Sequence, residues 1–103
     1  MGKVYFTLTG TNYYYGKDFL EPGMSVKLRK EPDNPYDREA IRVEFKGLEK
    51  IGYVANSART VLGDCCSAGR LYDHMGKKAK AKVIIKTERG VICELKQDEP
   101  EIL

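Results

Sequence analysis

The sequence contains no tryptophan, a single histidine (His74), four prolines and three cysteines in 103 residues. No apolar run is long enough to cross a membrane. The N-terminal residues lack the uninterrupted apolar segment of a signal peptide, so we expect a cytoplasmic protein with no membrane association. The adjacent cysteines Cys65 and Cys66 are poorly placed for a structural disulfide, and an odd cysteine count leaves at least one thiol free.

The few potential metal ligands do not form a recognisable motif. There is no CxxC pair, and a zinc site would require Cys65, Cys66 and His74 to converge, with or without Cys93, at spacings unlike those of zinc fingers. Reduced, partly buried thiols explain the cysteines better. We therefore expect neither a metal ion nor a cofactor.

Charge is distributed unevenly along the chain. Apolar residues make up 42% and charged residues 32%, a balance typical of one folded domain of this size. The net charge is +3, but Asp98, Glu99 and Glu101 lie near the C-terminus, and without them 18 basic residues face 12 acidic ones, a net charge of +6. We expect a folded domain over residues 1–97 and an acidic, frayed tail over residues 98–103. The positive domain suits an anionic partner without requiring one.

Strand-like alternation of apolar and polar residues recurs along the chain. It predicts six short strands, at residues 4–9, 24–29, 40–45, 50–54, 80–86 and 91–96. Pro22 and Gly23 occupy the positions that a type II turn prefers, and residues 88–90 predict a hairpin between the last two strands.

Two short helices are predicted between the fourth and fifth strands. Asn56 or Ser57 can cap one that Gly63 ends, and Ser67 can cap another that reaches Met75. The sequence thus predicts a mainly β fold with one or two short helices, arranged as a small OB-like β-barrel of about six strands.

The connection at residues 32–37, PDNPYD, is unusually rich in turn-forming residues. Its two prolines fix two φ angles and remove two amide donors, so the loop cannot extend the sheet. Asp33 and Asn34 can accept hydrogen bonds from nearby amides, and Asp37 from amides two or three residues further on. We expect a rigid loop that presents the ring of Tyr36. Alternatively, the loop is only a well-made turn with Tyr36 against the core, and the residues alone do not decide between these.

A second aromatic segment is NYYYG, at residues 12–16. Three consecutive tyrosines in an extended segment point to alternate sides, so at least one ring is expected to face away from the core. Exposed tyrosines can stack on nucleic-acid bases, although tyrosine is also a common packing residue of β-barrels, and this segment taken alone favours packing. Basic residues that can bind phosphates lie close in sequence to PDNPYD, namely Lys27, Arg29, Lys30, Arg38 and Arg42.

Four segments, in this order, resemble the HIRAN domain: TGTNYYYG, PGMSVKLRKEPDNPYDREAIRV, KIGYVANSARTV and SAGRLYD. The resemblance extends from Val4 to about Leu95, and its most specific motif runs from Glu31 to Val43. The HIRAN domain occurs fused to DNA-repair helicases and nucleases, and also as a stand-alone bacterial protein, the type that this chain resembles.

The resemblance implies an OB-like barrel that binds single-stranded DNA and prefers a free 3′ end. It places Tyr13, Tyr14 and Tyr36 around the terminal nucleotides and Asp37 where it accepts a hydrogen bond from the 3′-hydroxyl. The chain departs from members attached to eukaryotic fork-remodelling enzymes, which carry an arginine in place of Asn12 and a lysine near the position of Asn56. The complete set of candidate DNA-binding residues is Asn12, Tyr13, Tyr14, Lys30, Asn34, Tyr36, Asp37, Arg38, Tyr53 and Asn56.

We therefore expect a non-catalytic module for single-stranded DNA, acting in DNA repair or replication-fork processing with a helicase or nuclease partner. One alternative is a Mg²⁺-dependent nuclease built on Asp33, Asp37 and Glu39, but carboxylates in such a loop more often cap amides. Another is a protein-interaction module that binds an extended peptide in the groove or at the edge of the hairpin at residues 80–96.

Overall fold

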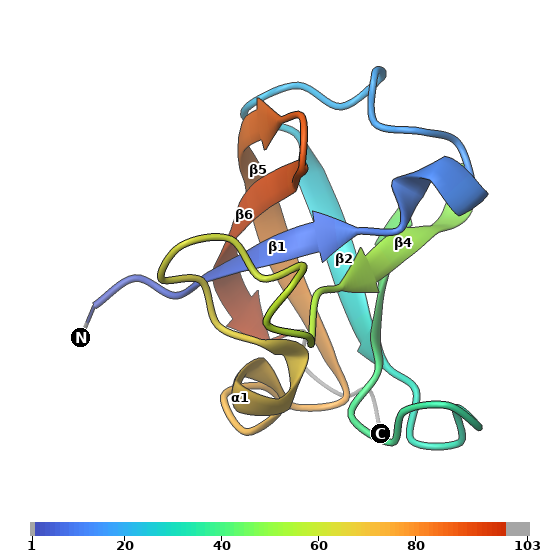
Figure 1. Cartoon of the computed structure of the whole chain (residues 1–103), viewed down its shortest axis with the longest axis vertical. Coiled ribbons are helices and arrows are strands. Elements are labelled where there is room, and N and C mark those ends of the chain that lie inside the picture. Colours follow the sequence, from blue (N-terminus) through green and yellow to red (C-terminus); the bar gives the residue numbers. More distant parts are fainter. Residues whose placement is uncertain (1, 99–103) are drawn as a thin grey trace.

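The computed structural model describes residues 2–98, which form a closed barrel of six antiparallel strands (Figure 1). Around the barrel the strands follow the order β1-β4-β3-β2-β5-β6, and β6 pairs with β1. Their bounds are β1 Tyr5–Thr9, β2 Ser25–Lys30, β3 Ile41–Phe45, β4 Glu49–Val54, β5 Lys78–Thr87 and β6 Gly90–Asp98. The predicted mainly β fold with a small six-stranded barrel is confirmed. Of the acidic tail predicted over residues 98–103, Asp98 is the last residue of β6 and the remainder lies outside the described residues.

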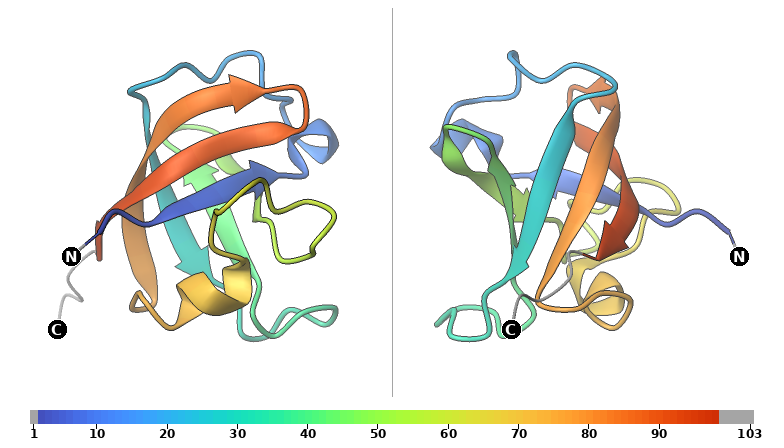
Figure 2. Two further views of the ribbon diagram at one scale, coloured as in Figure 1. Left: turned by 60° about the vertical axis from the view of Figure 1, so that its left-hand side comes forward. Right: turned by 180° about the vertical axis from the view of Figure 1, so that it is seen from behind.

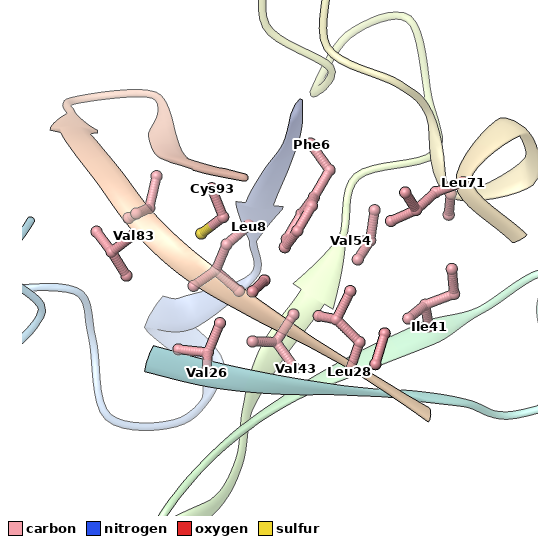
Figure 3. Close-up of a cluster of buried hydrophobic side chains, with 14 of the residues drawn as sticks. Phe6, Leu8, Val26, Leu28, Ile41, Val43, Val54, Leu71, Val83 and Cys93 are labelled. Carbon is pink, nitrogen blue, oxygen red and sulfur yellow. The ribbon is translucent and has the colours of Figure 1, made fainter. Parts of the chain in front are cut away.

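The strands form where the sequence alternates, because each turns its apolar residues into the barrel. In β2, Val26 and Leu28 are buried while Lys27 between them is exposed. Figure 3 shows side chains from several strands, among them Phe6 of β1 and Val83 of β5, gathered in the interior of the barrel. Burial of each such side chain stabilises the fold by roughly 1.5–3 kcal/mol. The core thus fills the barrel, and polar side chains are left on its outer surface.

A single α-helix, α1 (Ala68–Tyr72), is found among residues 2–98, and it lies at one end of the barrel (Figures 1 and 2). The Ser67 hydroxyl caps it by accepting a hydrogen bond from the amide of Arg70 at 3.3 Å, as predicted. Leu71 is fully buried and fastens the helix to the core. The helix ends before the predicted Met75. Within the described residues no helix is long and apolar enough to span a membrane.

The other predicted helix, from Asn56 or Ser57 to Gly63, is wrong. The segment forms one turn, in which the amide of Val61 bonds the carbonyl of Ser57, and then stops. The next amide, of Leu62, donates instead to the hydroxyl of Thr7 at 3.1 Å, so the helical ladder does not continue. A tertiary contact has therefore replaced a local one.

The junction of β1 and β4 requires a glycine. The strands meet through the pairs Leu8 with Val54 and Thr9 with Tyr53. A Cβ atom on Gly52 would stand 2.6 Å from the carbonyl oxygen of Thr9, closer than real Cβ contacts. This close approach places Tyr53 next to the end of β1, where the tyrosine-rich connection begins.

Candidate functional site

Two connections project on the same side of the barrel. One begins with a short 3-10 helix, η1 (Thr11–Tyr13), after β1, and the other is the loop at residues 31–40 between β2 and β3. Figure 1 has both on its right-hand side, and the view from behind in Figure 2 has both on the left. A groove of about 1070 Å³ lies here, lined by side chains of both connections and of β3 and β4.

Seven of the ten predicted site residues line this groove. They are Tyr14, Lys30, Asn34, Tyr36, Asp37, Tyr53 and Asn56. The other three do not line it: Asn12 and Tyr13 lie on η1, and Arg38 is exposed in the loop between β2 and β3. The structure therefore brings together residues that are up to 42 positions apart in the sequence.

The loop at residues 32–37 is held by its own side chains. The Asn34 side-chain oxygen accepts hydrogen bonds from the amides of Tyr36 at 2.9 Å and Asp37 at 3.1 Å. Asp37 in turn accepts from the amide of Glu39 at 2.9 Å. The predicted side-chain-stabilised turns are thus confirmed for Asn34 and Asp37. Tyr36 is 94% exposed, which excludes the alternative that its ring packs against the core.

The tyrosine segment is not extended as predicted but folds into η1 and a turn. The amides of Tyr14 and Gly16 both bond the carbonyl of Thr11, at 2.9 and 2.8 Å, and this closes the turn. The exposed fractions are 88% for Tyr13, 39% for Tyr14 and 56% for Tyr15. All three rings therefore reach solvent, and that of Tyr14 turns into the groove.

Asn56 joins the loop between β2 and β3 to helix α1. Its side-chain nitrogen donates to Oδ2 of Asp37 at 2.9 Å, and its side-chain oxygen accepts from the amide of Gly69 at 2.8 Å. A carboxylate offers about four acceptor positions, and the hydrogen bonds described here occupy two of those of Asp37. The carboxylate is thus fixed in place and keeps acceptor capacity toward the groove.

A hydrogen-bonded chain crosses the floor of the groove, and sequence reasoning missed two of its members, Lys50 and Glu31. Lys50 Nζ donates to the Tyr53 hydroxyl at 2.7 Å, and that hydroxyl donates to Oε1 of Glu31 at 2.8 Å. Asn34 donates to the same oxygen at 3.1 Å, and Arg42 lies 3.7 Å from Oε2. Lys50 is also 5.6 Å from the centre of the Tyr14 ring, within the range of a cation–π contact.

The protonation states keep this chain intact at neutral pH. Burial raises the pKa of Glu31, but the hydrogen bonds from Asn34 and Tyr53 together with the neighbouring cations outweigh it, so this pKa lies below its ordinary value. The hydrogen bond with Tyr53 raises the pKa of Lys50, and burial raises the pKa of Tyr53 itself. The groove therefore holds a charged lysine, a neutral phenol and an ionised carboxylate.

Lys50 escaped prediction because of an irregularity in β4. In a regular strand, residues three apart point to opposite faces. Here Val43 pairs with Gly52 and Glu44 with Lys50, so β4 contains one extra residue. This bulge turns Lys50 and Tyr53 to the same face. A glycine inside a strand pattern was the one signal in the sequence that could have indicated it.

The predicted cations differ in their availability. Lys30 donates to the carbonyl of Met75 at 2.8 Å and lies 4.0 Å from the centre of the Tyr72 ring, so its charge is directed toward the end of α1. Arg29 and Arg42, which the sequence indicated only as nearby basic residues, line the groove. The cations that line the groove therefore come from β2, β3 and β4, and they lie beside the carboxylates of Glu31, Asp33 and Asp37.

Potential metal ligands do not gather in the described part of the chain. Among residues 2–98 no group of three or more histidine, cysteine, aspartate or glutamate residues could hold a metal ion, and Asp33, Asp37 and Glu39 form no such group. Cys65, Cys66 and Cys93 are free thiols. Burial raises the pKa of Cys93 to about 12, so this thiol stays protonated and unreactive in the folded protein.

The comparison with solved structures identifies a similar barrel. The crystal structure of the HIRAN domain of human HLTF superposes with a TM-score of 0.60 at 20% sequence identity, over 91% of this chain and 74% of that one. At this identity the likeness shows a shared fold. No curated protein sequence is similar enough to count as a match. The family model for the HIRAN domain matches residues 1–97, almost the entire sequence. The chain therefore belongs to the HIRAN domain family.

Proposed function

We propose that the protein is a non-catalytic module that binds single-stranded DNA, including its 3′ end, in the groove between η1 and residues 31–40. Membership of the HIRAN family supports a nucleic-acid-binding module. The observation that carries the finer proposal is that Tyr14 and Tyr36, from two separate connections, expose their rings in one groove with Lys50 and Arg42.

Each part of the groove matches one requirement of single-strand binding. Stacking of a base on an aromatic ring contributes roughly 1–3 kcal/mol per base and tolerates any sequence. The loop that holds Tyr36 is already ordered by Asn34 and Asp37, so little conformational entropy is lost when a base stacks on it. Lys50 and Arg42 supply charges for phosphates, whose binding releases counterions.

The 3′-end preference rests on Asp37. Its carboxylate lines the groove one residue after Tyr36, and Asn56 and the amide of Glu39 fix its orientation. A carboxylate accepts a hydrogen bond from a terminal hydroxyl and repels a terminal phosphate. A strand ending in a 3′-hydroxyl is therefore favoured over one ending in a 3′-phosphate. Recognition of such ends suits a role in DNA repair or replication-fork processing beside a helicase or nuclease.

Fluorescence anisotropy tests this function. Short single strands that end in a 3′-hydroxyl or a 3′-phosphate, and a blunt duplex, are titrated over a salt series. We expect the hydroxyl-ended strand to bind most tightly and its affinity to fall steeply as salt rises. Equal weak binding of all three ligands contradicts end recognition. Salt-independent binding of an extended peptide in place of DNA identifies the groove as a protein-interaction site.

A further inference from the structure

Helix α1 and the residues that follow it lie at the same end of the barrel as the loop at residues 31–40, as both views in Figure 2 show. We call residues 67–77 the α1 segment. Ala68 and Leu71 hold its first part to the core because they are fully buried, and Met75, which is 7% exposed, holds its second part. The α1 segment is therefore a firm support against which a neighbouring loop can be positioned.

The first attachment between the α1 segment and the loop is Lys30, the residue directly before the loop. Its backbone amide donates to the carbonyl of Lys77 at 3.0 Å, and its side-chain nitrogen donates to the carbonyl of Met75 at 2.8 Å. The same nitrogen lies 4.0 Å from the centre of the Tyr72 ring, within the range of a cation–π contact. The ammonium group that the sequence predicted as a DNA contact is thus engaged by the α1 segment.

The second attachment is Asn56, which reaches the other end of the loop. Its side-chain oxygen accepts from the amide of Gly69, and its nitrogen donates to Asp37 at 2.9 Å and to Glu39 at 3.4 Å. An amide side chain both accepts and donates, so it can join a backbone amide to a carboxylate, which an apolar or an acidic side chain cannot do. With two carboxylates facing its two hydrogens, Asn56 is directed toward the loop and not toward a phosphate.

The first turn of α1 is held closely against both of the segments that Asn56 joins. The amide of Ala68 donates to the carbonyl of Ala55 at 2.9 Å, directly beside the bond between Gly69 and Asn56. A Cβ atom on Gly69 would stand 2.6 Å from Oε1 of Glu39, so this carboxylate lies directly against the helix backbone. Movement of α1 would therefore move the loop as well.

We propose that the α1 segment positions the DNA-binding loop through Lys30 and Asn56, and that these two residues act on DNA only through the loop. This inference rests on the proposed function of the groove and extends it, because it makes Asn56 a positioning residue for 3′-end recognition. The amide of Glu39 holds one oxygen of the Asp37 carboxylate and Asn56 holds the other. Without Asn56 the carboxylate can rotate about the remaining bond and lose its alignment with the 3′-hydroxyl.

The variant Lys30→Met separates positioning from phosphate binding, because it keeps most of the side-chain length and removes the charge. A short oligothymidylate that ends in a 3′-hydroxyl is titrated by fluorescence anisotropy over a salt series. We expect Kd to rise roughly two- to tenfold, the cost of ordering a loosened side chain on binding, with an unchanged salt slope. The comparison variant Lys50→Met, at a cation assigned to phosphates, should lower the slope by about 0.7. A slope lowered equally by Lys30→Met, or wild-type affinity, contradicts the proposal.

The variant Asn56→Leu tests the positioning of Asp37. Strands that end in a 3′-hydroxyl or a 3′-phosphate are titrated, and the ratio of the two affinities should fall about tenfold, as expected for loss of one hydrogen bond to a charged group. In a protein that already carries Asp37→Ala, the same substitution should leave the ratio unchanged. Additive effects of the two substitutions would show that Asn56 contacts DNA itself, and an unchanged ratio in Asn56→Leu alone would show that it positions nothing. Either result overturns the inference.

The variant Thr87→Val controls for a general loss of stability. The Thr87 hydroxyl bonds Arg89 and Gly90 within the hairpin between β5 and β6, which Figure 1 has at the top, with α1 at the bottom. This variant should lower the melting temperature and leave the affinity, salt slope and end preference unchanged. Changes equal to those of Lys30→Met and Asn56→Leu would overturn the positioning role.

The outcomes also separate this inference from the function on which it rests. Failure of the wild type to bind either strand overturns the proposed function itself. If the wild type binds both strands with equal affinity, 3′-end recognition is wrong, and the affinity and salt slope of Lys30→Met still decide whether the α1 segment positions the loop.

Discussion

Replacement of Tyr36 by alanine distinguishes a ring that stacks on a DNA base from a ring that packs in the protein core. The structure indicates how much free energy of unfolding or of binding each role would lose. The side chain is 94% exposed, so its removal leaves no cavity and buries no polar group. The free energy of unfolding should therefore change by less than about 0.5 kcal/mol. Loss of one stacked base, by contrast, should cost roughly 1–3 kcal/mol of binding, which is about a 5- to 150-fold rise in Kd.

The assay pairs fluorescence anisotropy on a single strand with thermal unfolding of the same protein. Tyr36→Phe, which keeps the ring, should retain most of the affinity. Tyr15→Ala removes another exposed tyrosine whose ring does not line the groove and should bind as the wild type does. The stacking argument fails if Tyr36→Ala binds with wild-type affinity, or if Tyr36→Phe loses as much affinity as Tyr36→Ala.

Three further variants test the framework around the groove. Asn56→Ala removes the hydrogen bonds to the groove loop and to α1 and should lower the free energy of unfolding by about 1–3 kcal/mol, measured by urea denaturation. Gly52→Ala forces a Cβ against backbone and should destabilise by about 1–3 kcal/mol, whereas Gly2→Ala, with open space around it, should be neutral in the same assay. The folded pKa of Glu31 is lowered, so its stabilising effect is complete above the unfolded value of 4.5 and is lost as pH falls through the lower folded value. Glu31→Gln should therefore flatten the acid side of a plot of stability against pH, and an unchanged slope contradicts the hydrogen-bonded chain.

The strands were predictable because a barrel strand buries every second residue, and that periodicity is visible without any tertiary information. Val26 and Leu28 in β2, or Ile41 and Val43 in β3, sit at the spacing that one buried face demands. The loop at residues 32–37 was predictable for a similar reason, since Asn34 bonds amides of its own neighbours. Features that arise within a few residues are thus accessible from sequence.

Features that depend on distant residues were not accessible. The predicted helix after Asn56 failed because the amide of Leu62 bonds Thr7, which is 55 positions away. The place of Lys50 in the groove depends on a bulge in β4, and its partner Glu31 lies beyond the end of another strand. The groove itself exists only because barrel closure brings two connections to one side.

The central claim is that one strand of DNA lies between the tyrosines of two connections, and chemical-shift mapping tests it most directly. Isotope-labelled protein is titrated with a short single strand that ends in a 3′-hydroxyl, and the backbone amide signals are followed by NMR. The account predicts that the largest changes occur together at Tyr14, Tyr36, Asp37 and Asn56. Changes concentrated on the outer faces of β1 and β6, with the groove residues unaffected, would contradict it.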